Sequence, residues 1–241
     1  MVRHSKDPTV LSGKQIVLTI DGVSRGVRRI FPIAIFGIPF GIAFGAAAVE
    51  KGLAAHQVII MSVIIFSGMA QFASLDLWRD PIAFGSLTLI VLAVNARHVV
   101  MGAALSPWVN ALPFRQRILA MSYLSDPNFA DSRPALKSGE RDIGILLGGG
   151  LILWVNWIIG TTLGAFGGSL IGNPAIYGLD VVMLCFFAAT VMGQTKEITS
   201  VISVVVAAFA AVLSLEWLPS GWNIVVAGLA GGVAGTLFHA E

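Results

Sequence analysis

The chain has 241 residues, of which 56% are hydrophobic and only 12% are charged. A water-soluble domain normally carries about 25% charged residues, because its surface faces water. Half that fraction cannot cover a soluble body of this size, so we expect lipid to cover much of the surface. The mean hydropathy of +0.85 agrees, and the composition excludes an ordinary soluble globular domain.

The first segment, residues 1–26, is polar and basic. The net charge of +2 is small, but basic residues gather at the start of the chain: Arg3, Lys6, Lys14, Arg25, Arg28 and Arg29. Because cytoplasmic segments carry the excess of Lys and Arg, we expect this segment in the cytoplasm. It lacks the apolar core and cleavage site of a signal peptide, which indicates insertion through the first span.

The apolar stretches that follow predict helices. A helix needs about 20 apolar residues to cross a hydrocarbon core of roughly 30 Å. Candidate stretches are residues 30–49, 57–77, 82–105, 143–170, 178–193, 198–215 and 222–238. None alternates like a barrel strand. The predicted fold class is therefore all-α: a polytopic integral membrane protein with about seven transmembrane helices, forming one transmembrane transport domain over residues 27–241.

The polar connector, residues 107–142, creates a conflict of topology. It follows three candidate spans, so a cytoplasmic N-terminus would place it outside. Its five Lys and Arg residues favour the cytoplasm instead. Both cannot hold if all three early stretches cross completely. Either one stretch is re-entrant or part of the connector crosses, and the sequence leaves both open.

A glycine ladder marks the first apolar stretch. Gly37, Gly41 and Gly45 recur every four residues and fall on one side of a helix, where a second helix can approach closely. Pro39, beside Phe40, removes a helical hydrogen bond and favours a kink. Two interpretations remain: a packing face with a bend, or a broken helix beside a substrate site.

Further ladders occur later in the chain. Gly160, Gly164, Gly168 and Gly172 repeat the same spacing, and a shorter ladder joins Gly228 to Gly232. Glycine-interrupted segments at corresponding places in two halves indicate two inverted repeats with Gly/Pro-broken helices, with a binding site between them.

Polar residues inside apolar stretches are the candidate functional residues. Asn95, Arg97 and His98 lie within the third stretch, where an arginine costs roughly 2.5–3.5 kcal/mol at the bilayer centre. On an intact helix Asn95 and His98 share a face, and Arg97 points away. Arg97 should face protein, water or a carboxylate, unless it only snorkels to the membrane surface.

Other polar candidates stand in the second, fourth and fifth stretches. Ser67 and Gln71 are one turn apart, and Gln71 could serve either as interhelical glue or as a substrate contact. Asn156 lies among aromatic residues. Asp180 begins the fifth stretch, where it could cap a helix or couple protons.

Signs of enzymatic or metal chemistry are missing. His4, His56 and His239 have no partners at metal-ligand spacing, and no phosphate-binding glycine loop or hydrolase motif occurs. The single Cys185 is expected to be a buried apolar side chain. We predict no catalytic residue, no metal and no cofactor, and no binding to nucleic acid.

Several of these segments together resemble one family. They are residues 37–45, 67–72, 95–102, 156–161 with Gly164, and 178–180. In this order, over roughly residues 26–238, they resemble the AzlC family, the large subunit of bacterial branched-chain amino acid exporters. One departure is in the connector, where the family often has Thr-Asp-Glu and this chain has Ser125, Asp126 and Pro127.

The resemblance implies a function, a partner and a location. It implies export of valine, leucine and isoleucine, with methionine as a further candidate, driven by an ion gradient for which protons are expected. It implies a small AzlD-type membrane subunit and the bacterial cytoplasmic (inner) membrane. The candidate residues of the translocation path are Gly37, Pro39, Phe40, Gly41, Gly45, Ser67, Gln71, Asn95, Arg97, His98, Asn156 and Asp180.

Two other classes of function remain open. The chain could be the membrane permease subunit of an ATP-driven importer, in which case substrate would stimulate hydrolysis on another polypeptide. It could also be an intramembrane enzyme or a non-transporting scaffold. Export of labelled amino acids from cells with and without the chain separates these classes.

Overall fold

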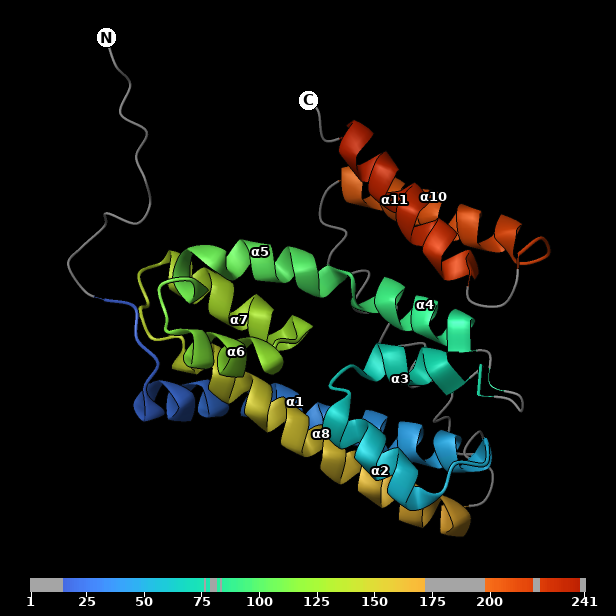
Figure 1. The fold of residues 1–241 in the computed structure, drawn as a ribbon, viewed down its shortest axis with the longest axis horizontal. Coiled ribbons are helices and arrows are strands. Elements are labelled where there is room, and N and C mark those ends of the chain that lie inside the picture. Colours follow the sequence, from blue (N-terminus) through green and yellow to red (C-terminus); the bar gives the residue numbers. More distant parts are fainter. Residues whose placement is uncertain are drawn as a thin grey trace. The chain divides into compact units, whose positions relative to one another are not determined.

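The computed structural model describes residues 15–75, 77–78, 82, 84–171, 198–218 and 222–238. Its helices are α1 (Ile20–Glu50), α2 (Ala55–Ile64), α3 (Gly68–Leu75), α4 (Phe84–Asn95), α5 (Arg97–Val109), α6 (Phe114–Ser122), α7 (Asp126–Lys137), α8 (Gly144–Ile171), α10 (Ile198–Ser214) and α11 (Trp222–Phe238) (Figure 1). The described residues contain no strand beyond a single bridge between Val17 and Asp142. The all-α class is confirmed.

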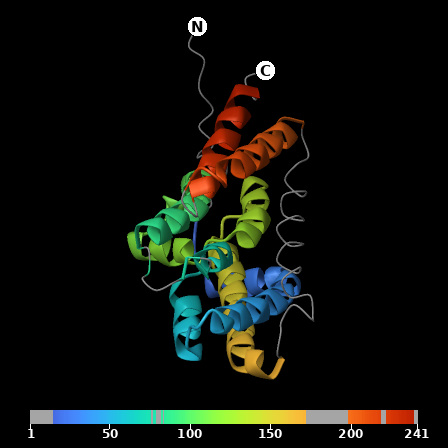
Figure 2. The ribbon, with the colours of Figure 1, turned by 90° about the vertical axis from the view of Figure 1, so that its right-hand side faces the viewer.

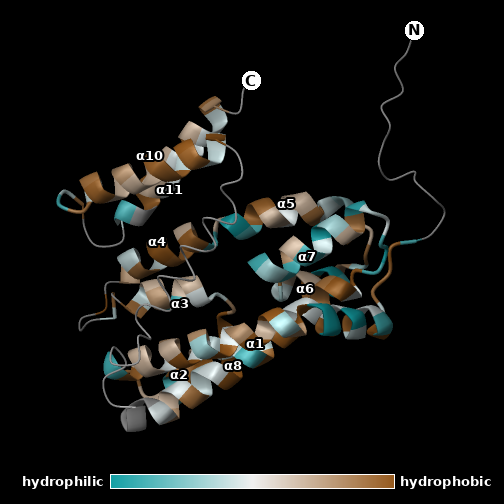
Figure 3. Ribbon diagram, turned by 180° about the vertical axis from the view of Figure 1, so that it is seen from behind, coloured by the Kyte–Doolittle hydropathy of each residue, from teal (hydrophilic) through white to brown (hydrophobic). Residues whose placement is uncertain are grey.

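Three segments are long and apolar enough to cross a membrane: Ile20–Glu50, Phe84–Val109 and Gly144–Gly167. Shorter apolar helices are Ala55–Ile64, Ile198–Ser214 and Val225–Phe238. Figure 3 shows hydrophilic residues at the start of α1 and around α7, whereas α10 and α11 are mostly hydrophobic. The stretch 178–193 lies outside the described residues, so the count of seven spans stays a prediction, as do the limits of the single domain.

The described residues separate into two compact units. Unit 1 contains the described residues up to Phe36 together with Arg97–Asn156, and unit 2 contains Gly37–Ala96 together with the described residues from Trp157 onward. Helices α1 and α8 contribute their first halves to unit 1 and their second halves to unit 2.

In unit 2 the predicted glycine ladders form a contact between α1 and α8. A Cβ atom on Gly41 would lie 2.9 Å from the Cα atom of Gly160, and one on Gly45 would overlap the backbone of Thr161. A Cβ on Gly164 would likewise overlap the Ile42 carbonyl. These glycines are needed because the two backbones touch.

Two glycines of these ladders, Gly37 and Gly172, are not part of the described contact. A Cβ atom on Gly37 would have no neighbouring atom within 4 Å, so Gly37 takes no part in the contact. Gly172 lies outside the described residues. Helix α1 continues without interruption through Pro39, so the break that this proline suggested is not in α1.

In unit 1 the same two helices also pack through glycine. A Cβ on Gly26 would overlap the carbonyl of Ile145, and one on Gly148 would overlap that of Val23. A Cβ on Gly144 would lie 2.6 Å from the Thr19 carbonyl oxygen. Contacts advance together along both helices, from Thr19 with Gly144 to Val23 with Gly148, so these halves are parallel.

The segment after α1 forms two short helices in unit 2. Helices α2 and α3 have 10 and 8 residues, or about 15 and 12 Å at 1.5 Å per residue, too short to cross roughly 30 Å. Leu53, before α2, and Leu75, at the end of α3, lie in one buried cluster with Phe44 and Ala165. The segment therefore folds as a helical hairpin with its tip at residues 65–67. The single helix expected over 57–77 is divided.

The connector of unit 1 is also helical. Helices α6 and α7 share one buried cluster with α5 and the start of α8, formed by Met101, Leu105, Val109, Leu112, Ala120, Leu124, Leu136, Ile143 and Leu146. In the loop that connects the two helices, the Tyr123 ring packs edge-on against the Trp154 ring of α8, with 5.6 Å between the ring centroids. Asn128 donates to the carbonyls of Tyr123 and Leu146 at 2.7 and 2.9 Å, which fixes the start of α7 against α8.

Helices α10 and α11 pack side by side in unit 2 (Figures 1 and 2). Gly231 and Gly235 form this contact: a Cβ on Gly231 would lie 2.9 Å from the Ala207 Cβ, and one on Gly235 would lie 3.0 Å from the Ser203 Oγ. Gly228 and Gly232, the pair chosen from sequence spacing, have no such neighbour within 4 Å. The glycines that pack against α10 therefore lie on a different face of α11 from the pair chosen by spacing.

The start of α1 contacts the end of the connector. Val17 pairs with Asp142, and the Arg25 guanidinium binds the Glu140 carboxylate. From these contacts we predict that residues 15–26 and the end of the connector lie on the same side of the membrane. If the α2–α3 hairpin enters and leaves the membrane on one side, Phe84–Val109 is the second complete crossing, in agreement with this prediction.

We expect cysteine labelling to reveal this topology. In a Cys185→Ala background, Gln15→Cys and Lys137→Cys should react with a membrane-impermeant maleimide only after cells are permeabilised. Lys51→Cys, beyond the far end of α1, is the control and should react in intact cells. Labelling of Lys137→Cys but not Gln15→Cys in intact cells would contradict the shared side.

The α1–α8 contact predicts an asymmetry between two neighbouring glycines. Gly41→Leu should lower the melting temperature in detergent by several degrees, because overpacking costs about 1–3 kcal/mol and each kcal/mol shifts the midpoint by about 2–4 °C. Membrane insertion should persist, since leucine is apolar. The matched control Gly37→Leu, in open space, should melt like the parent protein. Equal melting of the two variants would contradict the contact.

Candidate functional site

A chain of buried polar side chains surrounds the tip of the α2–α3 hairpin. Gln71 is fully buried, and its Nε2 donates to the Ser62 Oγ at 3.0 Å. The Ser62 hydroxyl donates to the Thr161 Oγ1 at 3.2 Å, and the Trp157 indole donates to the Gln71 Oε1 at 2.7 Å. These hydrogen bonds connect α2, α3 and α8.

The Trp157 ring fixes the position of the tip. It lies so close to Gly68 that a Cβ there would be 2.8 Å from the ring. The Phe44 ring stacks on the Trp157 ring with 6.0 Å between the ring centroids. It meets the Phe72 ring edge-on, with 5.2 Å between those centroids. Apolar packing thus holds the interrupted segment beside α8.

The interruption places the carboxyl end of α2 and the amino end of α3 at the tip. There the Ile65 N–H donates to the Met61 carbonyl at 2.8 Å, and the Gln71 N–H donates to the Ser67 carbonyl at 3.0 Å. At this point the Ser67 Oγ is buried without a hydrogen-bond partner among the described residues. An unsatisfied buried hydroxyl is unfavourable. The tip therefore combines donors and acceptors suited to a small polar group, as at the broken helices of transporters.

Ser67 and Gln71 differ in their hydrogen bonding. Gln71, which sequence alone left between two roles, bonds to other side chains of the protein. Ser67, one turn earlier, keeps a hydroxyl with no partner in the described part of the chain. Gln71 therefore supports the tip, and Ser67 is the better candidate for contact with a ligand.

The Asn95, Arg97 and His98 cluster lies at an interruption between helices. Helix α4 ends at Asn95 and α5 begins at Arg97, with Ala96 as a turn between them. Asn95 belongs to unit 2, and Arg97 and His98 belong to unit 1. The Arg97 Nη1 lies 3.0 Å from the Asp126 Oδ2. A carboxylate partner for Arg97 was one of the expected environments, but Asp126 was not identified.

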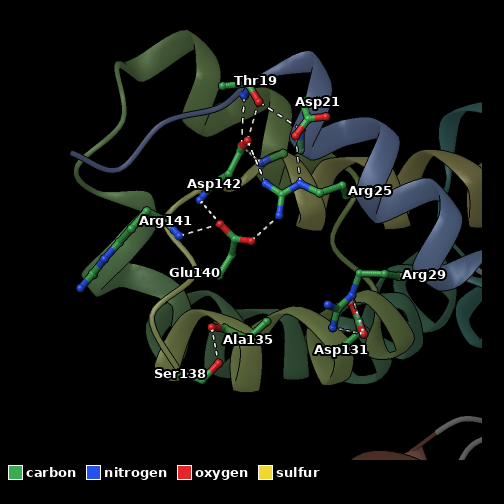
Figure 4. A network of polar contacts seen from close by, with 12 residues as sticks. Thr19, Asp21, Arg25, Arg29, Asp131, Ala135, Ser138, Glu140, Arg141 and Asp142 are labelled. Atoms are coloured by element: carbon green, nitrogen blue, oxygen red, sulfur yellow. Dashed lines mark hydrogen bonds and ion pairs between the residues drawn. The ribbon is translucent and has the colours of Figure 1, made fainter. Parts of the chain in front are cut away.

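An ion-pair network joins the start of α1 to the connector (Figure 4). Arg25 binds Glu140 and lies 3.4 Å from the Asp142 carboxylate. The Thr19 hydroxyl donates to Asp142. Burial alone would raise the pKa of Glu140, but hydrogen bonds from Arg25 and from the backbone N–H groups of Asp142 and Arg141 outweigh it and lower the pKa. The carboxylate is therefore charged at neutral pH, and the network is complete there.

A second ion pair in this region connects α1 with α7. The Arg29 Nη2 lies 2.8 Å from the Asp131 Oδ1, and the Arg29 Nε donates to the same carboxylate (Figure 4). Sequence reasoning used the basic residues only to orient the chain. Arg25 also pairs with Asp21, four residues before it. The acidic partners in the connector are more than a hundred residues away, so no local pattern could identify them.

The remaining predicted residues differ in their surroundings. Asn156 is 6% exposed, and its Nδ2 has no hydrogen-bond partner among the described residues, so this amide remains a candidate ligand group of unit 1. Gly41 and Gly45 are buried in helix packing, Phe40 is half-buried and Pro39 is exposed. Asp180 lies outside the described residues.

Comparison with known proteins adds a relationship. The model of the AzlC protein family matches residues 32–171. The inner membrane protein YgaZ of Escherichia coli is 30% identical over 223 residues, covering 88% of this chain and 87% of that protein. The branched-chain amino acid transport protein AzlC of Bacillus subtilis is 27% identical over 172 residues, covering 69% and 67%. No solved structure is significantly similar.

The family match covers the candidate site described above. The matched residues 32–171 contain α2 to α7, most of α1 and all of α8, including the hairpin tip and the Arg97–Asp126 pair. More than half of the chain is covered, and apolar helices of membrane-spanning length lie within it. This chain belongs to the AzlC family of membrane proteins.

Proposed function

We propose that the chain is the large subunit of an exporter of branched-chain amino acids. It moves valine, leucine and isoleucine, with methionine as a further candidate, out of the cell across the cytoplasmic membrane. A proton gradient drives it, and a small AzlD-type membrane subunit completes it. The observation that carries this proposal is membership of a family in which one relative is named a branched-chain amino acid transport protein.

The chemistry of the hairpin tip supports an amino acid as the cargo. A zwitterion needs donors for its carboxylate and acceptors for its ammonium. The dipole at the amino end of α3 favours the carboxylate, and the Ser67 hydroxyl beside it can donate or accept a hydrogen bond. Aromatic side chains around Trp157 suit an aliphatic side chain.

In unit 1, Arg97 is a candidate group for a substrate carboxylate, because a guanidinium binds carboxylates through paired N–H donors. His98 follows it in the chain, and we assign it to proton coupling because an imidazole can both donate and accept a proton. We place both on the translocation path, with the glycines of α1 as the surface that lets helices move closely past one another. Asn95, Asn156 and Asp180 complete the proposed path.

The test is export of labelled amino acids from cells. Cells that produce this chain with its small partner should lose preloaded valine, leucine and isoleucine faster than cells without it, and collapse of the proton gradient should abolish the difference. The chain alone should be inactive. Stimulation of an ATPase by substrate would instead favour the permease of an importer, and unchanged export of all four amino acids would refute the proposal.

Ser67 and Gln71 should respond differently to substitution. Gln71→Leu leaves the buried Trp157 N–H without its acceptor, which costs about 1–3 kcal/mol and should lower the melting temperature. Ser67→Ala removes a hydroxyl that has no partner in the described residues, so stability should be unchanged while export falls several-fold. Wild-type export by Ser67→Ala at equal expression would exclude this hydroxyl from the substrate site.

A further inference from the structure

The Arg97–Asp126 pair lies at an unusual place for two charges. Arg97 is near the middle of the apolar segment Phe84–Val109, where it is the first residue of α5. Asp126 is the first residue of α7 and reaches it from the connector. Charged side chains within apolar segments pair with one another or face a water-filled cavity, so Arg97 and Asp126 each provide the other's counter-charge.

The pair is accessible as well as paired. The Arg97 and Asp126 side chains are 30% and 40% exposed within this chain, so a small molecule can reach the contact. Partly exposed ion pairs are weak, with a median of about 0–1 kcal/mol. A contact of that strength can be exchanged for another carboxylate, whereas a fully buried pair could not be opened without a large penalty.

The other acidic residues of this region already have their own partners. Asp131, further along α7, binds Arg29, and Glu140 and Asp142 bind Arg25. Those contacts join the start of α1 to the connector. The Arg97–Asp126 contact differs because it joins the first residue of α5 to the start of α7.

We propose that Asp126 occupies the place of the substrate carboxylate. Asp126 pairs with Arg97 when the site is empty, and the carboxylate of an aliphatic amino acid displaces Asp126 from Arg97 when it binds. This inference rests on the proposed function and adds to it a residue that sets affinity. Since the substrate must displace Asp126, the ion pair weakens binding and favours release. Asp126 is thus a positioning residue for Arg97 and does not itself contact the substrate.

The test measures affinity for two related ligands. Leucinol keeps the ammonium and the aliphatic side chain of leucine but has no carboxylate. In the purified protein with any subunit that accompanies it, Asp126→Asn should bind leucine about two- to fivefold more tightly, the factor that a partly exposed ion pair supports. Leucinol affinity should not change. Export of leucine by Asp126→Asn should be slower, because release is slower.

Two further variants separate charge competition from structural damage. Asp126→Glu keeps the carboxylate and should retain the leucine affinity of the parent protein. Asp131→Asn removes a carboxylate from the same helix but from a different partner, and should leave the ratio of leucine to leucinol affinity unchanged. If Asp126→Asn is not recovered as folded protein, Asp126→Ser replaces it with the same expected result.

The outcomes distinguish this inference from the proposed function. If the parent protein exports leucine but Asp126→Asn binds it equally or more weakly, or gains as much for leucinol, the role of Asp126 is overturned and the transport function stands. If the parent protein exports none of the four amino acids, the proposed function fails and the inference fails with it. A gain confined to leucine supports both.

Discussion

The direct contact between the backbones of α1 and α8 is the constraint on which the rest of the described structure depends. Gly41 and Gly45 meet Gly160 and Thr161 in unit 2, and Gly26 meets Ile145 in unit 1. Without a hydrophobic driving force between helices in lipid, close van der Waals contact is the main attraction available. Helix α8 also supports the other elements: Trp157 fixes the hairpin tip, and Leu146 and Trp154 fix the connector.

The hairpin tip illustrates how apolar packing can present polar groups at depth. The Phe44, Phe72 and Trp157 rings surround the interruption, and the Gln71 amide satisfies the Trp157 N–H and the Ser62 hydroxyl. The cost of interrupting a helix is thereby confined to a few backbone groups and the Ser67 hydroxyl. A protein that must bind and release a small zwitterion needs such groups where water is scarce.

Sequence reasoning succeeded where the signal was local and failed where partners were distant. Glycine spacing identified Gly41 and Gly45 because a four-residue repeat has a direct meaning on a helix, but it could not tell that Gly37 faces open space. The apolar run around Ile65 carries no proline, so the interruption there was not seen. The pairing of Arg97 with Asp126 and of Arg25 with Glu140 depends on tertiary structure. The topology conflict stays open, and the contact between Val17 and Asp142 favours the solution in which an early stretch is re-entrant.

The distance along the chain between α1 and α8 has a consequence for biogenesis. The hydrogen bond from Thr19 to Asp142 joins residues 123 positions apart, and the glycine contacts that follow span a similar separation. Domains form in order as a chain is synthesised, so α1 enters the membrane long before its partner exists. During that interval its glycine face lacks the backbone that covers it in the complete chain. A chain that ends before α8 would keep this face uncovered and would leave α1 without the contact that fixes its position.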